Sequence, residues 1–194
     1  FAAGESDKWA DAVSRPTPPY VPMDFGMGVE GFPAIYMTEF AARHYTKWLS
    51  LKTGRFYRLP TEAEWEFAAR SGDSKHLFPW NKSQFEPGLA NLGAVPPRTF
   101  PVDSFESGAS AQGILHLIGN AAEWTDSWYG AYPAKQPQHS SEFGEKYKVM
   151  RGGHWMFQSP EFLTGSARSW SPIAATACKS SAVVSTTVQP AARA

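Results

Sequence analysis

Residues 149–170 read VMRGGHWMFQSPEFLTGSARSW and contain many of the side chains that could bind or transform a ligand. Aromatic side chains and methionine supply adaptable contact area, and arginine or glutamine fixes the orientation of a ligand. The mixture is therefore typical of a recognition surface. Its candidate ligand-binding residues are Arg151, His154, Trp155, Phe157, Gln158, Glu161, Phe162 and Arg168.

Two of these assignments have alternatives. Trp155 and the two phenylalanines could fill the core behind the loop, and for Trp155 we favour that interpretation. His154 could contact a ligand or carry a proton, but we favour a histidine without a catalytic role.

Other chemistry is not supported. The histidines at positions 44, 76, 116, 139 and 154 form no HxxxH pair, and no G-x-S-x-G elbow or phosphate-binding loop is present. Glu62, Glu64 and Glu66 lie in a predicted helix, where capping and the helix dipole explain them. The sequence therefore gives no support to a hydrolase.

The 194 residues carry 18 Lys and Arg against 18 Asp and Glu, so the formal net charge is +0. This balance predicts neither a nucleic-acid nor a membrane partner. We expect a protein, peptide or small-molecule ligand. The single cysteine, Cys178, excludes an intrachain disulfide and a multi-thiolate metal site.

Two helices must position these residues. Thr38 predicts an N-cap and Gly54 a stop, with Ala41, Ala42, Tyr45, Trp48 and Leu49 on one apolar face. In RLPTEAEWEFAAR, Thr61 and Glu64 have capping-box spacing, which predicts a helix to about Arg70.

The remainder predicts loops and short strands. Turn residues across 71–113 indicate a long loop region with short strands, and residues 114–130 predict a strand pair around the Gly119-Asn120 bend. KYKVMRGGHWM predicts a strand that ends at two glycines, where a bulge or a close backbone approach is expected. A further strand is predicted at 181–187.

Four segments in order, RLPTEAEWEFAAR, GNAAEWTDSWYG, KVMRGGHWM and SARSW, resemble the formylglycine-generating enzyme family, also called sulfatase-modifying factors. The resemblance implies a loop-rich α+β fold of the C-type lectin-like type, with two helices packed on small twisted mixed sheets. We expect a Pro/Gly-rich, N-terminally truncated lead-in at 1–30, the family domain at 31–170, and a divergent, aromatic-free tail at 171–194.

Enzymes of this family bind copper through two cysteines downstream of the Arg-Gly-Gly turn. By that resemblance the two positions fall on Phe157 and Phe162, and a phenyl ring can neither bind Cu(I) nor exchange thiols. Copper is therefore not expected. We treat Cys178 as a small incidental or buried residue, not a replacement for the pair.

The resemblance also implies a structural calcium site around the Gly-Asn bend. Gly119, Ala121 and Glu123 are the metal-binding candidates. His116 stands where the family places an oxygen ligand, and calcium prefers oxygen. The alternative is that Glu123 accepts backbone hydrogen bonds in a tight turn.

Together these features predict a ligand- or protein-binding accessory domain that has lost the copper centre. One alternative is a sulfatase-maturation-type oxidoreductase, or another maturation enzyme of the family, completed by a different site or a partner chain. A third is an incomplete gene product with altered ends.

Overall fold

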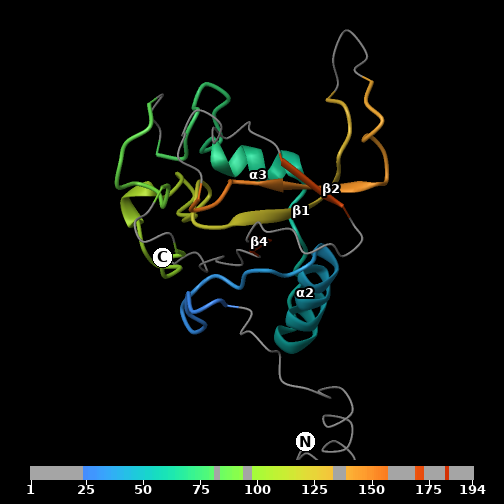
Figure 1. Cartoon of the computed structure of the whole chain (residues 1–194), viewed down its shortest axis with the longest axis horizontal. Helices are drawn as coiled ribbons and strands as arrows, with labels where there is room; N and C mark the ends of the chain where they lie inside the picture. The colour runs from blue at the N-terminus through green and yellow to red at the C-terminus, as the bar shows by residue number, and fades with distance from the viewer. Residues whose placement is uncertain are drawn as a thin grey trace, which may run out of the picture.

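The computed structural model describes residues 24–80, 84–93, 98–132 and 139–156, together with the backbone of short strands at 169–172 and 182–183. Two helices and a sheet dominate this part of the chain (Figure 1). Helix α2 covers Glu39–Thr53 and helix α3 covers Glu62–Ala69. Within the described residues, neither helix combines the length and the apolar character that crossing a membrane requires.

The sheet has four strands in the order β3-β2-β1-β4. Its members are β1 (Ala122–Trp128), β2 (Tyr147–Arg151), β3 (Ser169–Pro172) and β4 (Ala182–Val183). Strand β2 is antiparallel to β1 and β3, whereas β4 is parallel to β1, so the sheet is mixed as expected. In Figure 1, α3 lies above this sheet and α2 below it.

Both predicted helices are confirmed, with their caps. Thr38 accepts from the Ala41 backbone N–H, and Gly54 closes α2 in the left-handed conformation at φ 68°. Thr61 and Glu64 form the reciprocal capping box at the start of α3. These signals depend on a few neighbouring residues, which is why the sequence alone identifies them.

The predicted buried face of α2 is wrong. Ala42 is fully buried, but Tyr45 and Trp48 are 42% and 49% exposed. The helix instead turns its small side inward, because Ala42 packs in a core cluster with Leu59, Trp124 and Met150. A bulky residue there would hold the helix away from the sheet.

The strand pair predicted around the Gly-Asn bend is also wrong in its first half. Strand β1 follows the bend, but residues 114–118 form no strand, because His116, Gly119 and Asn120 take positive φ and interrupt an extended ladder. The buried amide of Asn120 instead accepts from the Phe100 backbone N–H and from Asn91 Nδ2.

The predicted short strands of 71–113 are absent from the described parts of that region. One 3-10 turn, η1 at Glu106–Gly108, and an isolated bridge from Asn91 to Gly119 replace them. The aromatic side chains do order the region, since Phe78 stacks on Trp80 at 5.0 Å between ring centroids.

Strand β2 ends at the glycine pair as predicted, and the close backbone approach is confirmed. Gly152 has φ 85°, and a Cβ there would lie 3.0 Å from the Leu117 carbonyl oxygen and 3.3 Å from the Trp65 ring. Glycine therefore lets the end of β2 pass between the bend and α3.

Candidate functional site

Arg151, the last residue of β2, lies at the centre of the site. Its side chain is completely buried, and its guanidinium is 4.9 Å from the centroid of the Trp65 ring. Nη1 lies 3.2 Å from Glu62 Oε1, and Nη2 lies 3.0 Å from Glu66 Oε2. The sequence predicted Arg151 as a ligand-binding residue, whereas its side chain is buried and is not among those that line the pocket described below. Its two acidic partners were not predicted.

Helix α3 supplies both partners because Glu62 and Glu66 are one turn apart and share a face. The interpretation of these glutamates as capping residues holds for Glu64, whose carboxylate accepts from the Thr61 backbone N–H. Glu62 lies in the first turn, as the dipole interpretation requires, but it also pairs with Arg151 across 89 residues of sequence. The interpretation fails for Glu66, which pairs with Arg151 across 85 residues. The i,i+4 spacing of these two glutamates indicates that they share a face of the helix, but it does not predict which distant residue that face contacts.

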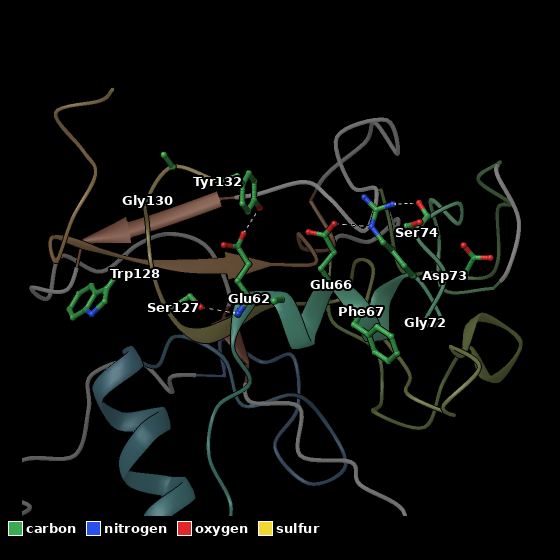
Figure 2. Close-up of a pocket in the computed structure, with 13 residues that line it drawn as sticks. Glu62, Glu66, Phe67, Gly72, Asp73, Ser74, Ser127, Trp128, Gly130 and Tyr132 are labelled. Atoms are coloured by element: carbon green, nitrogen blue, oxygen red, sulfur yellow. Dashed lines mark hydrogen bonds and ion pairs between the residues drawn. The ribbon is translucent and has the colours of Figure 1, made fainter. Parts of the chain in front are cut away.

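An open cavity of about 820 Å³ lies over these carboxylates (Figure 2). It is bounded by α3, by the turn that follows α3 and by the segment that follows β1. Trp128 lies at one end of the view and Phe67 and Asp73 at the other, with Glu62 and Glu66 between them. Concave surfaces of this size are typical of ligand sites.

Hydrogen bonds fix the polar groups of this pocket. Tyr132 donates its hydroxyl to Glu62 Oε1 at 2.7 Å, and Ser127 Oγ accepts from the Glu62 backbone N–H at 2.9 Å. Arg70 donates to Glu66 at 2.8 Å. Its second nitrogen donates to the Ser74 carbonyl at 2.8 Å, which holds the turn against the helix (Figure 2).

The aromatic side chains of the pocket remain accessible. Phe67 is 60%, Tyr132 45% and Trp128 38% exposed. Lys148 Nζ lies over the Trp128 ring, 4.2 Å from its centroid. The pocket therefore combines a fixed, paired polar floor with exposed apolar walls.

The other predicted ligand-binding residues are placed differently. Trp155 is buried, with 6% exposure, which agrees with the core position favoured from the sequence. His154 lies beside it, and burial lowers the pKa of His154 below its usual range, which favours the neutral ring. The remaining five lie outside the described residues: Phe157, Gln158, Glu161, Phe162 and Arg168.

One of the proposed metal ligands, Glu123, has a buried carboxyl group. Glu123 Oε2 accepts from Trp65 Nε1 at 2.6 Å, so its partner is a side chain and not the turn backbone. Burial raises the pKa of Glu123 to about 8, which favours the neutral acid. Gly119 donates its N–H to the Gly152 carbonyl.

Calcium takes six to eight oxygen ligands, usually with ionised carboxylates. His116 directs its Nε2 to the Pro101 carbonyl oxygen at 3.1 Å and brings no oxygen. The described residues contain no group of three His, Cys, Asp or Glu side chains that could hold a metal. Among the candidate ligands only Glu123 has a side-chain oxygen, so calcium there would depend on the main-chain carbonyl oxygens of Gly119 and Ala121.

The fold and its two helix caps, sheet and Arg-Gly-Gly turn define the class of the protein as an α+β domain of the formylglycine-generating enzyme type. The chain belongs to the family of sulfatase-modifying factor enzyme 1-like domains, whose family model matches residues 28–180. The resemblance carried by the four sequence segments is thereby confirmed.

Two relatives and one solved structure illustrate this membership. The chain is 36% identical over 150 residues to hercynine oxygenase of Mycolicibacterium smegmatis, across 71% of this chain and 33% of that protein. It is 33% identical over 135 residues to the inactive C-alpha-formylglycine-generating enzyme 2 of Bos taurus, across 64% of this chain and 39% of that protein. The chain thus spans about a third of the length of these relatives.

The structure of PvdO from Pseudomonas aeruginosa superimposes with a TM-score of 0.62 at 24% identity. The match covers 86% of this chain and 70% of that chain. At this identity the likeness shows the fold alone, and it agrees with the α+β architecture expected from the sequence.

Proposed function

We propose that the chain is a ligand- or protein-binding accessory domain on the formylglycine-generating enzyme scaffold, without the copper-binding cysteine pair. One observation carries this proposal: Glu62, Glu66 and Arg70 of the pocket are held in ion pairs, whereas its aromatic walls are exposed. A ligand site needs a few oriented polar groups within an apolar concavity. A general base would need a lone pair directed at the substrate, but Glu62 and Glu66 are engaged by guanidinium groups.

The segment after Arg151 is the second part of the proposal. Arg151 supports the pocket from beneath through its two glutamates. Phe157 and Phe162, at the positions that the resemblance assigns to the cysteines, replace metal-binding sulfur by hydrocarbon. Together with His154, Gln158, Glu161 and Arg168, they are proposed to contact the ligand.

The relatives agree with this proposal at the level of the family. One of them is named an inactive formylglycine-generating enzyme, so the scaffold persists in a protein without that activity. A small polar or aromatic ligand would fit the pocket best, because aromatic walls and fixed hydrogen-bonding groups complement such a molecule.

An oxidoreductase or another maturation enzyme of the family is the second candidate. It is favoured by the 36% identity to a protein named hercynine oxygenase. Because Phe157 and Phe162 stand at the positions that the resemblance assigns to the cysteines, this candidate requires a reaction centre supplied by a different site or a partner chain.

Mass spectrometry separates the two candidates. The purified chain is incubated with copper, oxygen and a sulfatase-type cysteine peptide, with a copper-loaded family enzyme as positive control. We expect the peptide to keep its cysteine. Conversion to formylglycine would overturn the accessory-domain proposal.

Ligand binding is tested by NMR with phenol and benzamide as probes. We expect both to perturb the Gly130 backbone N–H and the Trp128 indole N–H, which border the pocket. Ala131→Trp should block the pocket and abolish the perturbation, while Ser141→Trp, at an exposed position that does not line the pocket, should not. Perturbations that persist in Ala131→Trp would place binding elsewhere.

A further inference from the structure

The side of α2 that faces solvent carries large apolar residues. Phe40, His44, Trp48 and Leu51 follow one another at intervals of four, four and three, so they lie on one side of the helix. Phe40 is 66%, Trp48 49% and Leu51 87% exposed. Phe56, just beyond the helix, is 84% exposed. Single exposed apolar residues are ordinary, but a row of them on one helix marks an interaction surface.

The charged residues within the stretch that carries this row all have one sign. No aspartate or glutamate occurs from Phe40 to Thr61, whereas this stretch contains Arg43, Lys47, Lys52, Arg55 and Arg58. Two of these cations pair with Glu39 and Glu64, which flank the stretch. The side chains of Lys47, Lys52 and Arg55 are exposed, and Lys52 Nζ lies 4.6 Å from the Trp48 ring centroid. The zero net charge of the whole chain therefore conceals a local basic surface.

We propose that this surface, the α2 face formed by Phe40, Trp48, Leu51, Lys47 and Lys52, docks onto a protein surface that presents an apolar groove with an acidic rim. Charge complementarity selects this occupant. A second copy of the chain would bring like charges together. An apolar helix row at this spacing is the element that enters a groove of another protein.

The surroundings of the domain favour protein over lipid as the occupant. The shared region makes up 33% and 39% of the matched relatives, so domains of this family function inside longer polypeptides. Helix α2 lies below the sheet in Figure 1, whereas α3, which contributes residues to the pocket, lies above it. The inference therefore goes beyond the proposed pocket function, and either can fail without the other.

The test uses two synthetic amphipathic helices of about 18 residues, or five turns. Both carry leucine on one face, with glutamate on the other face in the first peptide and lysine in the second. By isothermal titration calorimetry we expect the glutamate peptide to bind at least tenfold more tightly than the lysine peptide. Phe40→Ser combined with Leu51→Ser should weaken the glutamate peptide at least tenfold. Val29→Ser, which removes an equally exposed apolar residue elsewhere, should not.

Charge reversal gives the sharpest arm of the test. Lys47→Glu combined with Lys52→Glu should reverse the preference between the two peptides. Unchanged thermal melting of each variant verifies folding, which is expected because the altered side chains are exposed. Equal binding of both peptides, or binding of neither, would overturn the proposal.

Two further experiments test other occupants of the α2 face. Uptake of the domain by phosphatidylcholine vesicles with about 30% phosphatidylserine, lost in Leu51→Ser, would assign the face to an anionic bilayer. Concentration-dependent dimerisation in sedimentation experiments, lost in the same variant, would assign it to a second copy. Either result would overturn the protein-docking proposal, and we expect neither.

Discussion

Replacing Arg151 by methionine tests the central ion-pair arrangement. Methionine keeps much of the apolar volume under α3 but removes the cation that faces two carboxylates. The Glu62 side chain is 9% exposed and the Glu66 side chain is 26% exposed, so water compensates Glu62 least. Removing one partner of a buried pair costs about 3–5 kcal/mol of unfolding free energy.

The structure places the expected loss near the lower end of that range. Glu62 retains the hydrogen bond from Tyr132, and Glu66 retains the ion pair with Arg70. We therefore expect Arg151→Met to lower the free energy of unfolding by about 3 kcal/mol. That is a large part of the roughly 5–15 kcal/mol typical of a domain.

Urea unfolding followed by tryptophan fluorescence measures this loss, and an unchanged m-value verifies that the same surface unfolds. Arg55→Met is the matched control, because Arg55 is exposed, and it should change the free energy by less than about 0.5 kcal/mol. Adding Glu62→Gln to Arg151→Met removes the buried uncompensated charge and should restore about 1–2 kcal/mol. A loss below about 1 kcal/mol, or a further loss on adding Glu62→Gln, would refute the reasoning.

Three further predictions concern the surroundings of the site. The pKa of Glu123 is raised to about 8 in the fold, so its contribution to stability is full below pH 4.5 and is lost as pH rises through 8. Glu123→Gln should flatten the dependence of the melting temperature on pH in that range. If added calcium raised the melting temperature of the wild type but not that of Glu123→Gln, the carboxylate would be assigned to a cation. Glu64→Ala should lower the free energy of unfolding by about 1 kcal/mol, because it removes the capping box and the ion pair with Arg58. An unchanged free energy of unfolding would refute the capping role. The pKa of Glu64 is lowered to about 2, so its stabilisation is present above pH 4.5 and disappears as pH falls toward 2. Gly152→Ala should cost about 2 kcal/mol in urea unfolding through strain at positive φ, and a neutral result would contradict the close approach to Leu117.

Local signals determined what the sequence could predict about the fold. The helix ends at Thr38, Gly54 and Thr61 were found because each cap involves residues within a few positions of one another. The inward face of α2 was not found, since helical spacing groups apolar residues without saying which group meets the sheet. Ala42, not Trp48, faces the core.

The site shows the same limit at longer range. The Arg-Gly-Gly turn drew attention to Arg151 as a ligand-binding candidate but gave no sign of its ion pairs, because its partners are 89 and 85 residues away and are ordinary glutamates of a helix. The strand predicted before the bend failed for a related reason. The side chain of Asn120 forms hydrogen bonds with the backbone N–H and carbonyl of Phe100, in place of a neighbouring strand. A contact of this kind leaves no periodic pattern in the sequence.

The charge arrangement over Arg151 also restricts what the pocket can recognise. A cation that approaches Glu62 and Glu66 meets carboxylates whose charge is already matched by Arg151 and Arg70. An anion meets the Arg70 guanidinium, which is already bonded to Glu66 and to the Ser74 carbonyl, whereas Arg151 is completely buried. Electrostatic attraction to the centre of the floor is therefore small for either sign, and moving these pairs apart to accommodate a charged ligand would cost part of the stability that they provide. Binding energy must come instead from exposed apolar surface such as the Trp128 ring and from hydrogen bonds to groups held in place by the ion pairs. In the proposed binding role, the ion pairs would fix the shape of the floor, and the aromatic walls would determine how tightly a neutral ligand is held.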